Sequence, residues 1–245
     1  MRRTPETATD PLNRRVPADA ARAQATYRFG FWIALVTSVL TVITFALALT
    51  AIPNDVPYPF TSDVIVEQWP GDYLWMYPAM LLMLLFVALV ASVHEYAPPA
   101  RKVYSLLGLC AAIVAAGVLL IDYFIQVTVM QPSLEKGQLD GWAMLTQYNP
   151  NGVFIALEEL GYLLMSLVFL CLAPVFVQKD RLERAIRWLL ALSFAATVVA
   201  LIVVSASRGI DRGDLFEIIV ISIVWLTLIV AGPLLAVVFR RAVPR

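Results

Sequence analysis

The stretch Asn149–Phe176, NPNGVFIALEELGYLLMSLVFLCLAPVF, decides how the fold of this chain is interpreted. Its apolar run is long enough to cross a lipid bilayer, which takes about 20 helical residues. Asn149 is a favourable helix cap, and Pro150 is tolerated at the first helical position because an N–H group there would lack a partner anyway. The sequence therefore predicts a membrane-spanning helix over residues 150–176.

Two adjacent carboxylates, Glu158 and Glu159, lie one to two turns inside this predicted span. An ionisable side chain within a membrane is costly, so its presence favours a functional role. Neighbouring helical residues point about 100° apart, so the two carboxylates cannot share one direction. Glu159, Tyr162 and Ser166 follow the spacing of a single helix face, which we expect to look into a helix bundle.

The composition of the 245-residue chain is that of a membrane protein, with 60% hydrophobic residues and a mean hydropathy of +0.78. Residues 1–28 carry six arginines, three prolines and no apolar run, which predicts a disordered basic tail. Residues 29–241 are expected to form one all-α transmembrane domain. Its six predicted spans cover residues 29–51, 73–93, 103–130, 150–176, 188–205 and 215–239.

The basic residues are segregated along this topology. Fifteen of the 18 Lys and Arg residues fall in the tail, in the loops 94–102 and 177–187, or at the C-terminus, which lie on one side if six spans alternate. The positive-inside rule makes that side, with both chain termini, cytoplasmic. We expect a multi-pass protein of the cell inner (plasma) membrane. Twelve of the 18 acidic residues fall on the outer side or in outer halves of spans, a bias that insertion does not require.

Polar groups are expected to meet in the outer half of the bundle. Asp122 lies near the far end of the third span, and Arg208 lies at the outer turn before the sixth. We predict an outward-facing acidic pocket, with the loop 52–72 and the segment 132–148 as candidate lids. The predicted ligand-binding residues are Glu158, Glu159, Asp122, Tyr162, Gln126 and Arg208.

A structural interpretation of the same acids stays open beside this one. Asp122 or a glutamate can pair with Arg208 only to hold helices together, since buried charges are usually paired. For Glu217 and Arg212 the structural interpretation leads, because both are expected at the membrane interface.

The sequence lacks the residues that several classes of chemistry require. The single histidine, His94, excludes a bis-histidine haem and a multi-histidine metal site, and the two cysteines are not spaced as metal ligands. All three lysines lie in predicted loops, which excludes a retinal Schiff base within the bundle. Glu158-Glu159 is similar to the E-E-x-x-x-R motif of intramembrane CAAX-type proteases, but Leu163 stands at the arginine position. We expect no metal site, no cofactor and no nucleic-acid partner.

As a whole, the chain resembles uncharacterised six-helix bacterial integral membrane families of unknown function. The stretch Tyr148–Pro174, YNPNGVFIALEELGYLLMSLVFLCLAP, carries the resemblance. It implies a six-helix membrane fold, and it assigns neither an activity nor a catalytic residue.

Three functions remain open at this point. The first is binding or transport of a cation, a proton or a small amine in the acidic pocket. The second is an intramembrane enzyme that uses a carboxyl group as general acid or base on a lipid or isoprenoid, assisted by Tyr162 or Tyr123. The third is a non-catalytic sensor or assembly subunit. Membrane lipids are expected partners in each case, and each is compatible with a homo-oligomer.

Overall fold

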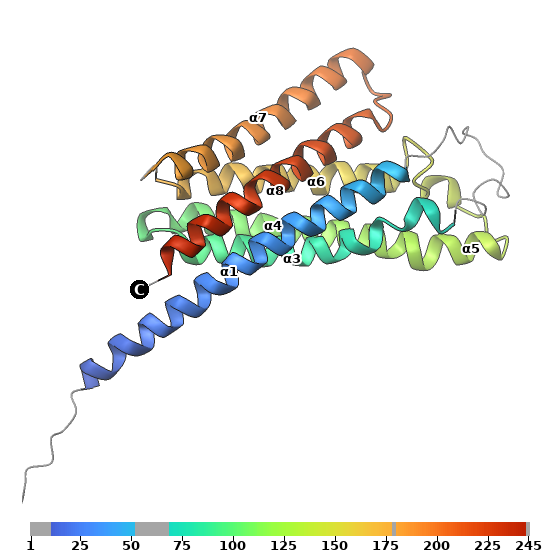
Figure 1. Ribbon diagram of the computed structural model, residues 1–245. Coiled ribbons are helices and arrows are strands. Elements are labelled where there is room, and N and C mark those ends of the chain that lie inside the picture. Colours follow the sequence, from blue (N-terminus) through green and yellow to red (C-terminus); the bar gives the residue numbers. More distant parts are fainter. Residues whose placement is uncertain (1–10, 52–68, 178–179, 244–245) are drawn as a thin grey trace, which may run out of the picture.

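The computed structural model describes residues 11–51, 69–177 and 180–243, with side chains from residue 21 onward. The described chain is helical, without a strand (Figure 1). Six helices are long and apolar enough to cross a membrane, which confirms the all-α, six-helix prediction and supports a multi-pass membrane protein. They are α1 (Pro11–Thr50), α3 (Met76–Tyr96), α4 (Lys102–Ile125), α6 (Val153–Leu172), α7 (Arg181–Arg208) and α8 (Leu215–Ala242).

Shorter elements connect these helices. The 3-10 turns are η1 (Gly71–Tyr73), η2 (Pro99–Arg101), η4 (Trp142–Met144) and η5 (Ala173–Val175). α4 continues through a π-helical turn, η3 (Gln126–Met130), into the short helix α5 (Gln131–Glu135). The π turn directly precedes Pro132, which has no N–H to donate and whose ring disturbs the regular α-helical pattern.

The helix boundaries differ from the predicted ones by a few residues at most ends, and three helix starts are informative. α1 begins at Pro11, so helical backbone runs through part of the predicted tail, where alanines between residues 18 and 25 favour a helix. Residues 1–10 of that tail, and most of the candidate lid at 52–72, lie outside the described residues. α7 begins at Arg181, seven residues before the prediction, because the Asp180 side chain caps it by accepting a hydrogen bond from the Glu183 N–H (2.9 Å).

The third difference concerns the helix predicted over residues 150–176. α6 begins at Val153 after Gly152, so Asn149 is not its cap and Pro150 lies outside it. Asn149 instead organises the preceding loop. Its Nδ2 donates to the Ala143 carbonyl (2.8 Å), and its Oδ1 accepts from the Asn151 N–H (3.0 Å). A side chain that closes such a turn is no longer available to the helix.

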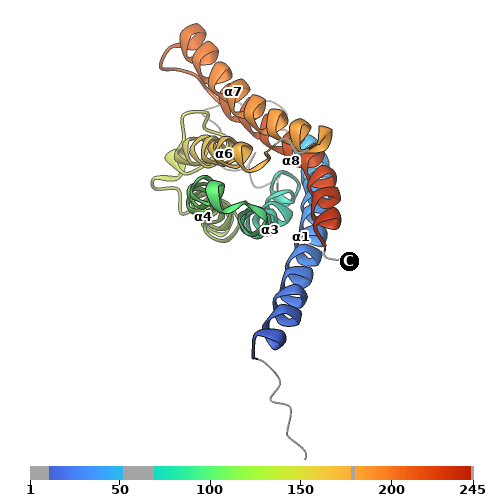
Figure 2. The same cartoon turned by 90° about the vertical axis from the view of Figure 1, so that its left-hand side faces the viewer.

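The six long helices form two layers. Helices α3, α4 and α6 run alongside one another, and α1, α8 and α7 cover them as a second, inclined layer (Figures 1 and 2). α4 and α6 approach closely because Gly108 lies against Cys171 and Leu172, and Gly161 lies against Leu119. Small residues on membrane-spanning helices allow such close packing.

α1 and α8 meet at a second close approach, which the sequence Gly232-Pro233 makes possible. Pro233 lies inside α8 and has no N–H, so it cannot bond the carbonyl of Ile229 four residues earlier. The Ser38 hydroxyl of α1 donates to that carbonyl at 2.9 Å. Gly232 leaves the room for this contact, because a Cβ there would lie 2.5 Å from the Ser38 Cβ. The Ser38 hydroxyl of α1 thus supplies the hydrogen bond to the Ile229 carbonyl that Pro233 cannot make.

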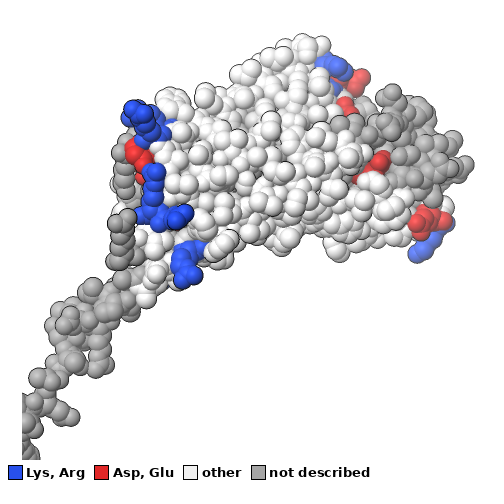
Figure 3. Space-filling model, viewed as in Figure 1, with Lys and Arg blue, Asp and Glu red and all other residues white. Residues whose placement is uncertain are grey.

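Charged groups gather at the two ends of the bundle, and the face in Figure 3 has a wide uncharged band between them. We call the two ends the basic end and the acidic end. The basic end, where α7 begins and α8 finishes, carries Arg101, Lys102, Arg181, Arg184, Arg187, Arg240 and Arg241. The acidic end carries Asp72, Asp122, Glu158, Glu159, Asp211, Asp214 and Glu217.

Candidate functional site

A cavity of about 550 Å³ lies at the acidic end between α1, α6 and α8. Three carboxylates line it: Glu158 from α6, Glu217 from the first turn of α8, and Asp214 directly before α8. Three large aromatic side chains complete the polar and aromatic wall: Trp75, Tyr148 and Trp225. α1 contributes apolar groups, among them Phe45 and Leu49. We call this space the acidic-end cavity.

The two adjacent glutamates of α6 have different surroundings. Glu158 is 2% exposed and lines the acidic-end cavity. Glu159 points elsewhere and forms an ion pair with Arg212 at 2.6 Å, beside a smaller cavity of about 170 Å³. The polar face of α6 that enters the bundle is therefore Glu158, Tyr162 and Ser166, which are spaced four residues apart and all buried. The prediction that Glu159 shares this inward face was wrong: helix spacing is compatible with either glutamate, and packing selects Glu158.

Asp122 and Gln126 of α4 and η3 lie behind Glu158, away from the cavity lining. Both are almost fully buried, and Gln126 Nε2 donates to Asp122 Oδ1 at 3.3 Å. The Glu158 carboxyl interacts with the carboxyls of Asp122 and Glu217. Within the described chain, three buried oxygens here make no hydrogen bond: Asp122 Oδ2, Gln126 Oε1 and Glu158 Oε2. Buried polar atoms are nearly always paired, so this cluster has unused bonding capacity.

Aromatic rings hold the cavity wall together. Trp225 contacts the rings of Trp75, Tyr162 and Phe45, with centroids 6.0, 6.0 and 5.5 Å apart. The Tyr162 hydroxyl lies 2.9 Å from that of Tyr123, so the two phenols share a hydrogen bond. This uses the polar end of Tyr162, which is fully buried and does not itself line the cavity.

The loop before α6 closes the wall at the acidic end. Tyr148 donates a hydrogen bond from its hydroxyl to Asp72 Oδ2 of η1 at 2.8 Å. Burial raises the pKa of the Tyr148 phenol well above its usual range. Within the candidate lid 132–148, residues 142–144 form the single 3-10 turn η4, with Trp142 buried.

The structure brings four of the six predicted residues together: Glu158, Asp122, Gln126 and Tyr162. Glu159 lies next to this group on the Arg212 side. Arg208 is exposed at the end of α7 and does not line the cavity.

Glu217 was not predicted to belong to the site, and no role was predicted for Trp75 and Trp225. Glu217 occupies the first turn of α8 and was interpreted as interfacial. One signal was available, since Glu217 precedes a long apolar run in the same outer layer as Glu158. The tryptophans carried no signal of their own, because aromatic residues in spans are usually packing groups.

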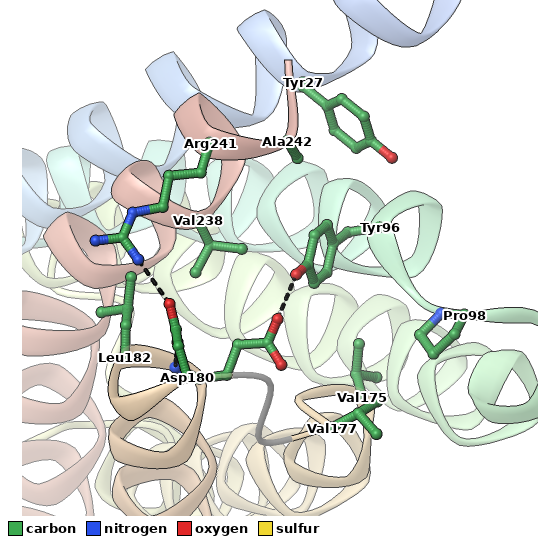
Figure 4. A pocket seen from close by; sticks show the side chains of 11 residues that line it. Tyr27, Tyr96, Pro98, Val175, Val177, Asp180, Leu182, Val238, Arg241 and Ala242 are labelled. Atoms are coloured by element: carbon green, nitrogen blue, oxygen red, sulfur yellow. Dashed lines mark hydrogen bonds and ion pairs between the residues drawn. The ribbon is translucent and has the colours of Figure 1, made fainter. Parts of the chain in front are cut away.

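A second cavity, of about 430 Å³, lies at the basic end (Figure 4). Tyr96 donates its hydroxyl hydrogen to Glu183 Oε1 at 2.7 Å, which joins α3 to α7. Arg241 pairs with Asp180 at 2.6 Å, which joins α8 to the start of α7. These contacts tie helices together around the cavity, and nothing in it parallels the buried carboxyl cluster of the acidic end.

Within residues 11–51, 69–177 and 180–243, no group of three or more His, Cys, Asp and Glu side chains is arranged to hold a metal ion. Comparison with protein-family models, with curated proteins and with solved structures finds no match. The function of this chain is therefore inferred from the chemistry of the site itself.

Proposed function

We propose that this membrane protein binds a small organic cation, such as an amine, in the acidic-end cavity. One observation carries the proposal: three carboxylates and four aromatic side chains line a single cavity of about 550 Å³. Carboxylates attract an ammonium group, and the faces of tryptophan and tyrosine rings attract it as well. Small-molecule pockets commonly enclose about 300–1,000 Å³, so the volume is suitable.

The same geometry favours an organic cation over a bare metal ion. A metal ion takes several oxygen or nitrogen ligands at about 2.0–2.6 Å and fills little space. Here the carboxylates share the cavity wall with apolar side chains, among them Phe45, Ile221 and Trp225. An amine with a hydrocarbon or aromatic body uses both parts of such a wall.

We place the acidic end outside the cell and the protein in the plasma membrane. The support is the concentration of Lys and Arg at the basic end, which the positive-inside rule assigns to the cytoplasm. In this orientation the cavity receives its cation from the outer side. Uptake of labelled cation into proteoliposomes distinguishes transport from binding alone.

Thermal unfolding of the full chain in mild detergent tests the proposal. The probes are n-butylamine, phenethylamine and tetraethylammonium, all cations near pH 7, with n-butanol as the uncharged control. A ligand that binds only the folded state stabilises it by about 2.7 kcal/mol at 100 times its Kd. We expect at least one cation to raise the unfolding temperature and n-butanol to leave it unchanged.

Two neighbouring variants separate binding from general charge effects. Glu158→Gln removes a cavity carboxylate, and Glu159→Gln removes an adjacent carboxylate that faces Arg212 instead. The cation-induced shift should disappear in the first variant and persist in the second. Absence of a shift with every cation, or equal shifts in both variants, would show that the carboxylates only hold the helices together.

A further inference from the structure

Three helices each direct one carboxyl group into the same small region of the acidic end. Asp122 comes from α4, Glu158 from α6 and Glu217 from α8, and Glu158 interacts with both of the others. Asp122 and Glu158 are buried, and Glu217 is half-buried at the cavity wall. We call these three groups the carboxyl cluster.

The groups around the carboxyl cluster supply little compensating positive charge. Arg212 is already paired with Glu159, and Arg208 is exposed at the end of α7. α1 lines this region with apolar side chains. The other titratable groups that face the cluster are neutral phenols or further acids: Tyr123 from α4, Tyr162 from α6, Tyr148 from the loop before α6, and Asp214 at the start of α8.

Like charges in direct contact and away from water cannot all be ionised. Carboxyl groups so arranged share protons and titrate as one system. In the empty cavity at neutral pH, the carboxyl cluster therefore retains at least one proton.

An independent observation points to the same state. Gln126 is 1% exposed and donates from Nε2 to Asp122, and its buried Oε1 makes no hydrogen bond. Glu158 lines the cavity, is 2% exposed and also has an oxygen without a hydrogen bond. A protonated carboxyl group in the cluster has a hydrogen to donate, which a carboxylate lacks, so it can bond one of these buried oxygens.

We propose that the site exchanges a proton for its cation. This inference rests on the proposed function. A cation enters the cavity, the O–H bond of one cluster carboxyl breaks, and the proton leaves through the cavity to bulk water. The carboxylate that forms pairs with the ammonium group, so the charge within the cavity is the same before and after the exchange. Binding the cation and holding the proton are then mutually exclusive.

Isothermal titration calorimetry tests the exchange. The probe is whichever of n-butylamine, phenethylamine and tetraethylammonium gives the largest thermal shift. Titration at one pH in phosphate and in MOPS, which differ in ionisation enthalpy and carry no net positive charge, reports the protons released per cation bound. We expect about one proton, and a Kd that tightens about tenfold per pH unit while the cluster is protonated, as linkage requires.

Two variants identify the source of the proton. Asp122→Asn removes one ionisable carboxyl group from the cluster without touching the cavity lining, so fewer protons should be released per cation than in the unaltered protein. Glu159→Gln lies outside the cluster and should release the same number of protons as the unaltered protein.

The outcomes separate the two proposals. Cation binding with no proton release and a Kd independent of pH overturns the exchange and leaves the binding function standing. No binding by any of the three cations overturns both. If Asp122→Asn does not fold, the pH dependence of Kd in the unaltered protein decides alone.

Discussion

Replacing Gly232 by alanine should separate α1 from α8. A Cβ at this position would lie 2.5 Å from the Ser38 Cβ and 2.7 Å from the Ala34 carbonyl oxygen. Carbon atoms in contact lie about 3.5–4.0 Å apart, so the two helices must move apart by roughly 1 Å. Overpacking of this kind costs about 1–3 kcal/mol.

The separation also stretches the hydrogen bond from Ser38 to the Ile229 carbonyl, which Pro233 cannot satisfy. A buried polar group that loses its hydrogen-bond partner costs about 1–3 kcal/mol more. The expected loss of unfolding free energy is therefore about 2–6 kcal/mol for Gly232→Ala. Ser38→Ala should cost only the loss of this hydrogen bond, about 1–3 kcal/mol.

Chemical or thermal unfolding in mild detergent, followed by circular dichroism, measures these losses. Gly117→Ala is the matched control, because Gly117 also lies within a long helix and a Cβ there meets nothing within 4 Å. It should be neutral or slightly stabilising, since alanine favours a helix by up to about 1 kcal/mol over glycine. Equal stability of the two alanine variants would refute the close approach of α1 and α8.

Three further predictions concern contacts at the two ends of the bundle. Tyr96→Phe should cost about 1.5–3 kcal/mol in unfolding experiments, because it removes a hydrogen bond to the buried Glu183 carboxylate, and no loss would contradict that contact. Arg241→Ala should cost no more than about 1 kcal/mol, since its ion pair is largely exposed; a larger loss would mean that the pair is buried in the native protein. Tyr148→Phe should weaken the loop that Asp72 anchors, and it should also change the alkaline limb of stability. The folded-state pKa of Tyr148 is raised above its ordinary value of 10.0, so its contribution is complete below about pH 10 and is lost as pH rises. The phenylalanine variant should therefore lose less stability than the unaltered protein when pH rises above that value, as urea titrations at several pH values would show.

Local patterns were sufficient for most of the fold. Each long apolar run became a helix long enough to span a membrane, because hydropathy and length are properties of one segment. Helix boundaries were less predictable where a loop side chain had more than one possible hydrogen-bond partner. Asn149 bonds within its own loop rather than capping α6, and Asp180 starts α7 earlier than the apolar run indicates.

The candidate site was predicted in part. Depth along the spans placed Asp122, Glu158 and Gln126 in one layer, since rise per residue is constant in a helix. Depth does not say which helices are neighbours. Glu217 joined the site only because α8 packs beside α6. Arg208 lay outside it because the end of α7 is exposed and does not reach the cavity lining.

The sequence by itself determined that this chain builds six apolar helices with its basic residues at one end, because both follow from the order of residues along single segments. Tertiary structure alone decided that Glu158 faces the cavity and Glu159 faces Arg212. The two glutamates are adjacent and chemically identical, and a helix turns about 100° between them. Which of them becomes buried depends on the rotation of α6 against α4 and α8, and that rotation is set by packing between residues far apart in the chain.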